Sequence, residues 1–138
     1  MPRTFALRLN PGFDHMYDID ASVGRTGRNK REDVFLVQYL LAIWMAHNND
    51  PKLMPIIIAA PVVKPDGIFG DKTHGGIQAL EQAFPHLVRD ARVDPMGFPS
   101  SKIFLLNQLL FSAGGLRAQV PNLRVEFPRV LVPLLFKP

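Results

Sequence analysis

The stretch Pro65–Phe84, PDGIFGDKTHGGIQALEQAF, decides the fold of this 138-residue chain. It begins with turn chemistry, because proline presets φ, aspartate can bond its own backbone, and the glycines at 67 and 70 allow a positive φ. Asp71 then begins a helix, with its acid at the positive end of the helix dipole. The side chains on one face of this helix are spaced by four, three and four residues: Thr73, Ile77, Leu80 and Phe84. The sequence therefore predicts a tight turn followed by a helix, with Phe69 packed against the helix start.

The composition indicates one globular domain, since 47% of the residues are apolar and 20% are charged. The chain has no cysteine, which excludes disulfides and thiolate metal sites. The net charge of +4 suits an anionic polymer or an acidic partner, although it is also common in ordinary globular domains. No apolar signal segment follows Met1, so we expect synthesis in the cytoplasm, with any role at the cell envelope reached by export with, or as part of, a particle.

Two further helices are predicted on either side of the turn. Asn29-x-x-Glu32 resembles a capping box and would begin a helix whose apolar run, 34–46, is interrupted only by Gln38. That helix is apolar on several faces, so it is either central or carries a second contact on its far side. It is too short to span a membrane, which needs about 20 apolar residues. Ser100-Ser101 would cap a third helix that runs to about Ala113. The expected core draws on all three helices: Val34, Val37, Leu41, Phe69, Ile77, Leu80, Leu106 and Leu110.

Several other segments are expected to be extended or irregular. Residues 4–9 alternate apolar and polar side chains and predict a short strand, whereas residues 13–30 are polar and predict a loop. Residues 53–63 contain three consecutive isoleucines and two prolines, which favours a short buried extended piece over a helix.

The last residues of the chain are too apolar to be left in water. They are interrupted by Pro128 and Pro133, which exclude a central strand. We expect this arm to pack on the domain, to pair with residues 4–9, or to dock on another protein subunit. The side chains proposed to contact a partner are Leu123, Val125, Phe127, Val130, Val132 and Phe136.

The first helix and the turn together resemble the small three-helix peptidoglycan-binding domains attached to bacterial and phage cell-wall enzymes. In that family an acid–Val pair precedes a Leu-Gln pair, and an Asp-Gly-x-Phe-Gly-x-x-Thr turn leads into a helix. Here Asp33-Val34 is followed by Val37-Gln38, and residues 66–73 match the turn without a gap. Further matches stand at Gly76-Ile77, Leu80-Glu81, Val93-Asp94-Pro95 and 106–109, so that the resemblance covers roughly residues 23–113.

The resemblance implies a mainly α fold, a three-helix bundle with short extended terminal arms. We divide the chain into an arm and loop at 1–22, a helical domain at 23–115, and an apolar C-terminal arm at 116–138. The 24 residues between Leu41 and Asp66 are more than the family usually has. Gly75-Gly76 also replaces better helix formers, at about 1 kcal/mol each relative to alanine, and close approach of another backbone would be one reason for these glycines.

No arrangement of residues in the sequence predicts catalysis, a cofactor or a bound metal. The four histidines are far apart, at positions 15, 47, 74 and 86, and have no metal-ligand spacing. The acids at 14, 18 and 20 lack the glycine and the glutamate of a calcium loop. Gly24–Arg28 lacks the Lys-Ser/Thr of a phosphate loop, and Ser100-Ser101 lacks a nucleophile elbow. The basic cluster Arg25, Arg28, Lys30 and Arg31 has no interleaved aromatics, which argues for a solvated face and against nucleic acid.

Two functions remain as hypotheses. The resemblance implies a non-catalytic module that binds peptidoglycan or a muropeptide in a shallow groove beside the turn, through Asp66, Thr73, His74 and Gln78. The alternative is a structural subunit of a phage tail or contractile injection particle, which would reuse this fold and dock its C-terminal arm on a neighbouring chain.

Overall fold

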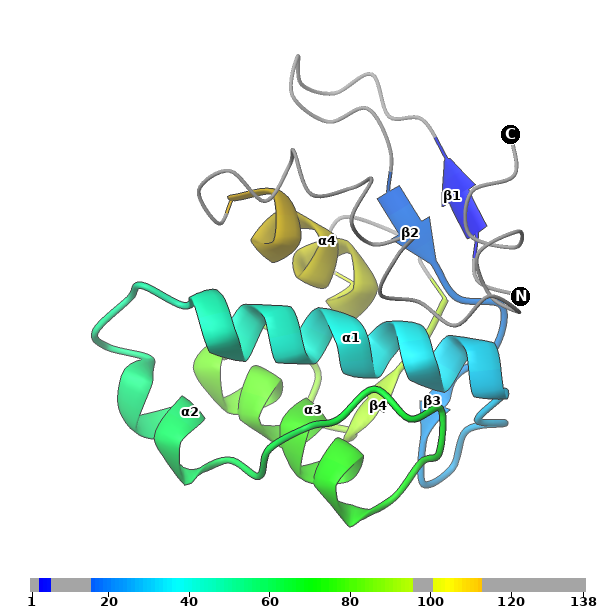
Figure 1. The fold of residues 1–138 in the computed structure, drawn as a ribbon, viewed down its shortest axis with the longest axis horizontal. Coiled ribbons are helices and arrows are strands. Elements are labelled where there is room, and N and C mark those ends of the chain that lie inside the picture. The colour runs from blue at the N-terminus through cyan, green and yellow to red at the C-terminus, as the bar shows by residue number, and fades with distance from the viewer. Residues whose placement is uncertain (1–2, 6–15, 96–100, 113–138) are drawn as a thin grey trace.

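The computed structural model describes residues 3–5, 16–95 and 101–112, and this part of the chain is mainly helical (Figure 1). The described helices are α1 (Arg31–His47), α2 (Met54–Ala59), α3 (Asp71–Ala83) and α4 (Lys102–Ser112). The described strands are β1 (Arg3–Phe5), β2 (Met16–Asp18), β3 (Val23–Gly24) and β4 (Arg92–Val93). The predicted mainly α fold is therefore confirmed, with α2 as a helix beyond the expected three.

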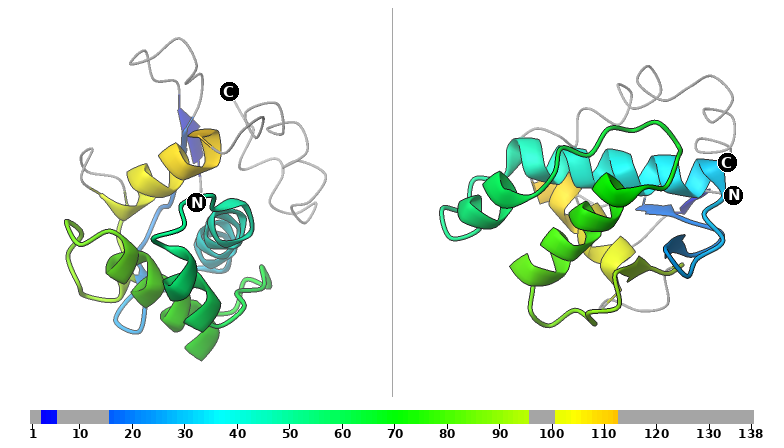
Figure 2. Two further views of the ribbon diagram at one scale, coloured as in Figure 1. Left: turned by 90° about the vertical axis from the view of Figure 1, so that its left-hand side faces the viewer. Right: turned by 90° about the horizontal axis from the view of Figure 1, so that it is seen from below.

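Helix α1 is the centre of the fold, as its apolar pattern predicts. It contacts both α3 and α4, which lie on different sides of it (Figure 2). Trp44 is 3% exposed, so it belongs to the core. Of the expected core, six side chains are buried: Val34, Val37, Leu41, Ile77, Leu80 and Leu106. Phe69 is partly buried against this core, and the side chain of Leu110 lies outside the described part of the structure.

The predicted capping box at Asn29 is wrong. The residue before α1 is Lys30, which makes no side-chain cap. Asn29 has a φ of 53° and turns its amide back onto the preceding loop, where Oδ1 accepts from the N–H of Gly24 at 2.9 Å. Its Nδ2 donates to the carbonyl oxygens of Gly24 and Gly27 at 2.7 and 3.2 Å. The side chain of Asn29 therefore closes the loop before α1 and is not available to cap the helix.

The extended piece predicted for residues 53–63 is also wrong, because Met54–Ala59 is the helix α2. The two prolines fit this helix. Pro55 lies in its first turn, where a backbone N–H has no intrahelical partner, and Pro61 follows its end. No residue of α2 is fully buried, although Ile56 and Ile57 pack partly against the core.

The close approach expected at Gly75-Gly76 is present, but it is made by side chains and not, as predicted, by another backbone. A Cβ added to Gly75 would lie 2.6 Å from Cγ of Pro61. A Cβ added to Gly76 would lie 2.6 Å from Cγ2 of Val63. The two glycines therefore let the segment after α2 lie directly against α3.

Two short antiparallel ladders hold the loops of the domain. β1 pairs with β2 in the register Arg3↔Asp18, and β3 pairs with β4 through Val23↔Val93. The prediction of a loop over residues 13–30 is thus wrong at β2 and β3. The strand predicted at 4–9 is present at 4–5, and residues 6–9 lie outside the described residues. His15 and the C-terminal arm at 116–138, with its six proposed partner residues, also lie outside them.

The cap predicted for α4 is found at Ser101. Its Oγ accepts a hydrogen bond from the backbone N–H of Phe104 at 3.2 Å, and its carbonyl oxygen accepts from the N–H of Leu105. This satisfies an N–H of the first turn that has no partner within the helix.

Candidate functional site

Gln38 holds the turn that the sequence singles out. Its side chain lies within α1 and is 1% exposed. Its Oε1 accepts from the backbone N–H groups of Asp66 and Gly67 at 3.0 and 2.9 Å. Its Nε2 donates to Oδ1 of Asp66 at 3.0 Å. The same Nε2 lies 2.9 Å from both the carbonyl oxygen of Ile68 and Oγ1 of Thr73. One buried amide therefore fixes the turn to the central helix.

Asp66 is bonded from two sides inside this turn. Its Oδ1 accepts from the N–H of Ile68 at 2.9 Å as well as from Gln38. The hydrogen bond from Ile68, followed by that from Gln38, lowers the pKa of Asp66 below its ordinary value of 3.8. This carboxylate is consequently charged at neutral pH and is held in one orientation.

The two glycines of the turn have different roles. Gly67 has a φ of 78°, so its conformation favours glycine, and an added Cβ would also lie 2.8 Å from Cγ of Arg31 and displace that side chain. Gly70 has a φ of −155°, which is extended backbone, and an added Cβ would have no atom within 4 Å. The prediction that Gly70 is needed for a positive φ is therefore wrong.

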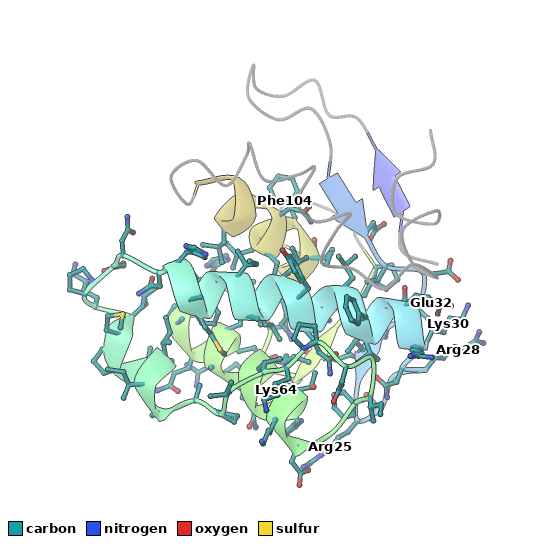
Figure 3. All side chains as sticks on the ribbon, viewed as in Figure 1. Arg25, Arg28, Lys30, Glu32, Lys64 and Phe104 are labelled. Carbon is teal, nitrogen blue, oxygen red and sulfur yellow. The ribbon has the colours of Figure 1, made fainter. Side chains whose placement is uncertain are left out.

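A pocket of about 250 Å³ lies beside the turn, at the start of α3, and we call it the polar pocket because most of the residues that line it are polar or charged. Its described lining carries two lysines and two aspartates, and Gly70 and Ile68 also belong to it. Figure 3 shows Lys64 on the segment that leads into the turn. The lining residues are Gln38, Lys64, Asp66, Ile68, Gly70, Asp71, Lys72 and Thr73. Since both signs of charge are present, the pocket suits a ligand that carries both.

The four residues proposed for binding from the sequence have different surroundings in the structure. Asp66 and Thr73 line the polar pocket, but Thr73 is 3% exposed and its hydroxyl oxygen is bonded to Gln38. Gln78 is exposed on α3. His74 is half-buried, and its Nδ1 has no hydrogen-bond partner among the described residues. Among the residues that line the pocket, neither His74 nor Gln78 appears.

Three residues that line the pocket, Gln38, Lys64 and Lys72, were not predicted from the sequence as site residues. One signal for Gln38 was present, because it is the only polar residue in the apolar run 34–46. A polar side chain at such a position needs a hydrogen-bond partner inside the protein. The lysines carried no signal, because only the fold brings Lys64 and Lys72 to the same pocket.

Asp33, the acid of the family-like Asp-Val pair, has a structural role. Its carboxylate is fully buried and accepts from the backbone N–H groups of Asp20 and Ala21, both at 3.0 Å. Burial raises the pKa of Asp33, and the two N–H donors offset that rise only in part. Asp33 thus joins the segment after β2 to α1, 12 to 13 residues away in sequence.

The basic cluster is a solvated surface, as the sequence indicates. Arg25 contacts Asp71 at 3.2 Å, and Lys30 contacts Asp20 at 2.7 Å, with all four side chains well exposed. The hydrogen bond from Lys30 holds the pKa of Asp20 far below its usual range. Figure 3 shows Lys30 and Arg28 at the N-terminal end of α1.

A second group of charges lies inside the domain. Nζ of Lys102 is 2.6 Å from Oε2 of Glu81 and 2.7 Å from the carbonyl oxygen of Arg92. It also contacts Asp90, whose pKa is raised by burial but lowered overall by the bonds from Lys102 and Arg92. Glu81 accepts in addition from the N–H of Ala91 at 2.7 Å. This network joins α3, α4 and the loop before β4, and its groups bond one another.

The described residues set limits on other kinds of site. Over 3–5, 16–95 and 101–112, no group of three histidine or acidic side chains is placed to hold a metal ion. Within the same ranges, no helix has the length and apolar character that crossing a membrane requires.

The chain folds into a small, mainly helical domain. In this domain Gln38 holds the turn at residues 66–73 by hydrogen bonds, and the polar pocket lies beside that turn. No protein-family model, no curated protein and no solved structure matches this chain.

Proposed function

We propose that this chain is a non-catalytic module that binds peptidoglycan and so holds a partner at the bacterial cell wall. The observation that carries the proposal is the turn that Gln38 fixes in place beside a pocket with both signs of charge. The proposal rests also on the motif at residues 66–73, which resembles that of wall-binding domains. A preformed site of this kind loses little conformational entropy when a ligand binds.

The chemistry of the pocket matches that of a muropeptide. A stem peptide presents carboxylates and amides, which Lys64 and Lys72 would bind through charge-assisted hydrogen bonds. The outer oxygen of Asp66 would accept from a ligand amide or ammonium group. Because Lys64 and Lys72 line the pocket and His74 and Gln78 do not, we propose the two lysines as ligand contacts in place of His74 and Gln78. No step of bond cleavage is proposed.

A pull-down on purified peptidoglycan sacculi tests the proposal. We expect retention of the full chain above that of an unrelated protein with the same net charge. Lys64→Gln combined with Lys72→Gln should weaken retention about tenfold or more, because hydrogen bonds to charged groups contribute about 1.5–3 kcal/mol each. The matched control is Lys52→Gln with Arg89→Gln, which removes the same charge from exposed positions elsewhere. Equal losses in both pairs would show attraction by net charge alone and would contradict the proposal.

Gly70→Tyr provides a second test that leaves the fold intact. Position 70 has extended backbone and open space around an added Cβ, so the variant should keep its stability. Because Gly70 lines the pocket, the new ring should fill part of it and block the ligand. Unchanged retention of this variant on sacculi would place the binding surface elsewhere.

A structural subunit of a larger particle is the second candidate function. The observation that favours it is the apolar surface at α2, where Ile58 is 75% exposed and Val62, just after the helix, is 69% exposed. Deleting residues 120–138 should then abolish assembly while the helical content stays. Light scattering that finds the same monomer before and after the deletion would count against this function.

A further inference from the structure

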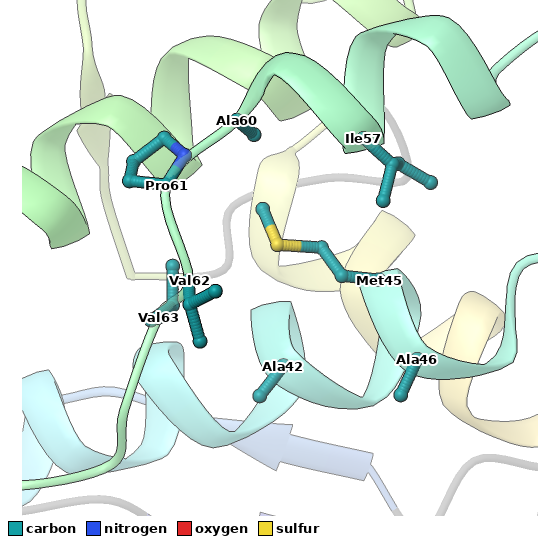
Figure 4. Close-up of a pocket in the computed structure, with 8 residues that line it drawn as sticks. All are labelled: Ala42, Met45, Ala46, Ile57, Ala60, Pro61, Val62 and Val63. Carbon is teal, nitrogen blue, oxygen red and sulfur yellow. The ribbon is translucent and has the colours of Figure 1, made fainter.

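An apolar pocket of about 270 Å³ shares no lining residue with the polar one (Figure 4). One wall is the C-terminal half of α1, with Ala42, Met45 and Ala46. Ile57 of α2 and the segment 60–63 complete the lining. None of these side chains is charged or carries a hydrogen-bonding group. A glycan or a charged peptide would therefore lose its hydration here without compensation, and the pocket calls for an apolar occupant.

Val62, which lines the pocket, is exposed, and so are two apolar side chains of α2 that do not line it. Ile58 and Val62 are 75% and 69% exposed, and Met54 is 37% exposed. Apolar side chains gathered in this way typically mark a contact surface, whereas single exposed ones need no explanation. Helix α2 is too short to be stable by itself and has no fully buried residue, so a covering segment would stabilise it.

The pocket is held open by its neighbours. Val63 lies so close to α3 that an added Cβ on Gly76 would come within 2.6 Å of it, and Pro61 approaches Gly75 in the same way. Val63 is 4% exposed and anchored in the core. Because the segment 60–63 rests on α3, it cannot move further inward to fill the pocket. The pocket is therefore preformed, which favours binding of a segment that presents one or two large apolar side chains.

The chain itself contains a segment with the required chemistry. Residues 130–136 read VLVPLLF and carry no charge. Pro133 disfavours a helix that continues through this segment. The residues between the end of α4 and position 130 span up to about 55 Å when extended. That exceeds the diameter of about 40 Å of a domain of this size, so the segment can reach the pocket of its own chain or of a neighbouring copy.

We infer that residues 130–136 are the occupant of the apolar pocket between α1, α2 and the segment 60–63. Attachment to the same chain raises the effective concentration of this segment far above that of a free peptide. Burying it also removes from water both the exposed side chains of α2 and the arm's own apolar run. The inference holds for either candidate function, because the pocket and its occupant are the same in a wall-binding protein and in a particle subunit.

Photo-crosslinking of the full chain tests this directly. Phe136 is replaced by p-benzoylphenylalanine, the protein is irradiated, and mass spectrometry locates the attached residues. We expect crosslinks to Met45, Ile57 or Val62. A crosslinked monomer would place the segment in its own chain and a crosslinked dimer in a neighbouring copy, and both support the inference. Crosslinks only to other residues, or none, would overturn it.

A matched pair of substitutions in the same photo-reactive chain completes the test. Ala46→Glu puts a charge into the wall of the pocket and should lower the crosslink yield about tenfold. Ala59→Glu is the control, because Ala59 is also exposed in the last turn of its helix but does not line the pocket. A yield that falls equally in both variants, or in neither, would contradict docking in this pocket. Sacculi retention is measured on both variants, so that failure of wall binding is seen separately.

Discussion

Replacing Gln38 with leucine should release the turn at residues 66–73 from the central helix. Gln38 accepts two hydrogen bonds from this turn through Oε1, and the two N–H groups of its Nε2 are shared among three acceptor atoms of the turn. Leucine is close in volume and fits the apolar run of α1, so the substitution leaves the packing of the helix largely intact. The effect therefore reports on the hydrogen bonds.

The magnitude follows from which partners remain buried. Gly67 and Thr73 are buried, so the N–H of one and the hydroxyl of the other would lose a partner that water cannot readily replace. Asp66 and Ile68 are exposed, so water can take over their bonds. A buried polar group left without a partner costs about 1–3 kcal/mol, and the added leucine recovers part of this. We expect a net loss of about 2–4 kcal/mol from a total of about 5–15 kcal/mol.

Urea unfolding followed by circular dichroism measures this change. The control is Gln78→Leu, which puts the same residue at an exposed position of α3 and should change the free energy of unfolding by no more than about 0.5 kcal/mol. The m-value should stay the same in both variants, because the buried area is unchanged. A loss of less than about 1 kcal/mol for Gln38→Leu would refute the role of Gln38 as the group that holds the turn.

Gln38→Glu separates the acceptor bonds of Gln38 from its donor bonds. Glutamate can still accept from Asp66 and Gly67, but its second oxygen would face the carboxylate of Asp66 and the carbonyl oxygen of Ile68. Burial and the neighbouring charge would raise the pKa of the new acid in the folded state above its unfolded value. The folded protein then binds the proton more tightly, so the penalty should shrink as the pH is lowered from 7 toward 4. A penalty independent of pH would contradict this arrangement.

Three further predictions concern packing, a buried ion pair and pH. Gly76→Ala would place a Cβ 2.6 Å from Cγ2 of Val63, and this overpacking, at about 1–3 kcal/mol, should outweigh the gain of about 1 kcal/mol that alanine brings to a helix; a variant stabilised in urea unfolding would show that this segment can move away. Lys102→Met should cost about 3–5 kcal/mol by leaving the buried carboxylate of Glu81 without its cation, and a thermal midpoint that does not fall would disprove that dependence. Asp66→Asn should flatten the dependence of stability on pH below 3.8, since a lowered folded pKa gives the wild type stability that is lost as the pH falls; an equally steep acid transition in both proteins would oppose this reasoning.

The sequence predicted those elements that short-range signals determine. The start of α3, its buried face and the cap at Ser101 follow from turn residues, helical spacing and capping side chains within a few positions. The central place of α1 follows from its apolar run in the same way. These predictions hold because the interactions behind them join residues that are near neighbours along the chain.

The predictions for residues 53–63 and for Asn29 were wrong because each of these local sequence patterns is compatible with two structures. Pro55 and Pro61 exclude a helix that continues through them, but here they lie at its two ends, and the sequence could not show on which side of the prolines α2 would form. Asn29 has the right spacing for a capping box with Glu32, yet its amide has three closer partners in the loop of Gly24 and Gly27. In both cases the packing of neighbouring segments determined which of the two structures formed.

The stretch Pro65–Phe84 by itself determined a turn, a helix and the face that this helix buries. Tertiary structure alone decided what the turn is attached to, because Gln38 lies 28 residues from Asp66 in sequence and contacts it only in the folded chain. It likewise brought Lys64 and Lys72 to one pocket and laid Val63 against Gly76. Dihedral preference and periodicity act over a few residues, whereas a pocket is made by side chains that only the packing of distant segments brings together.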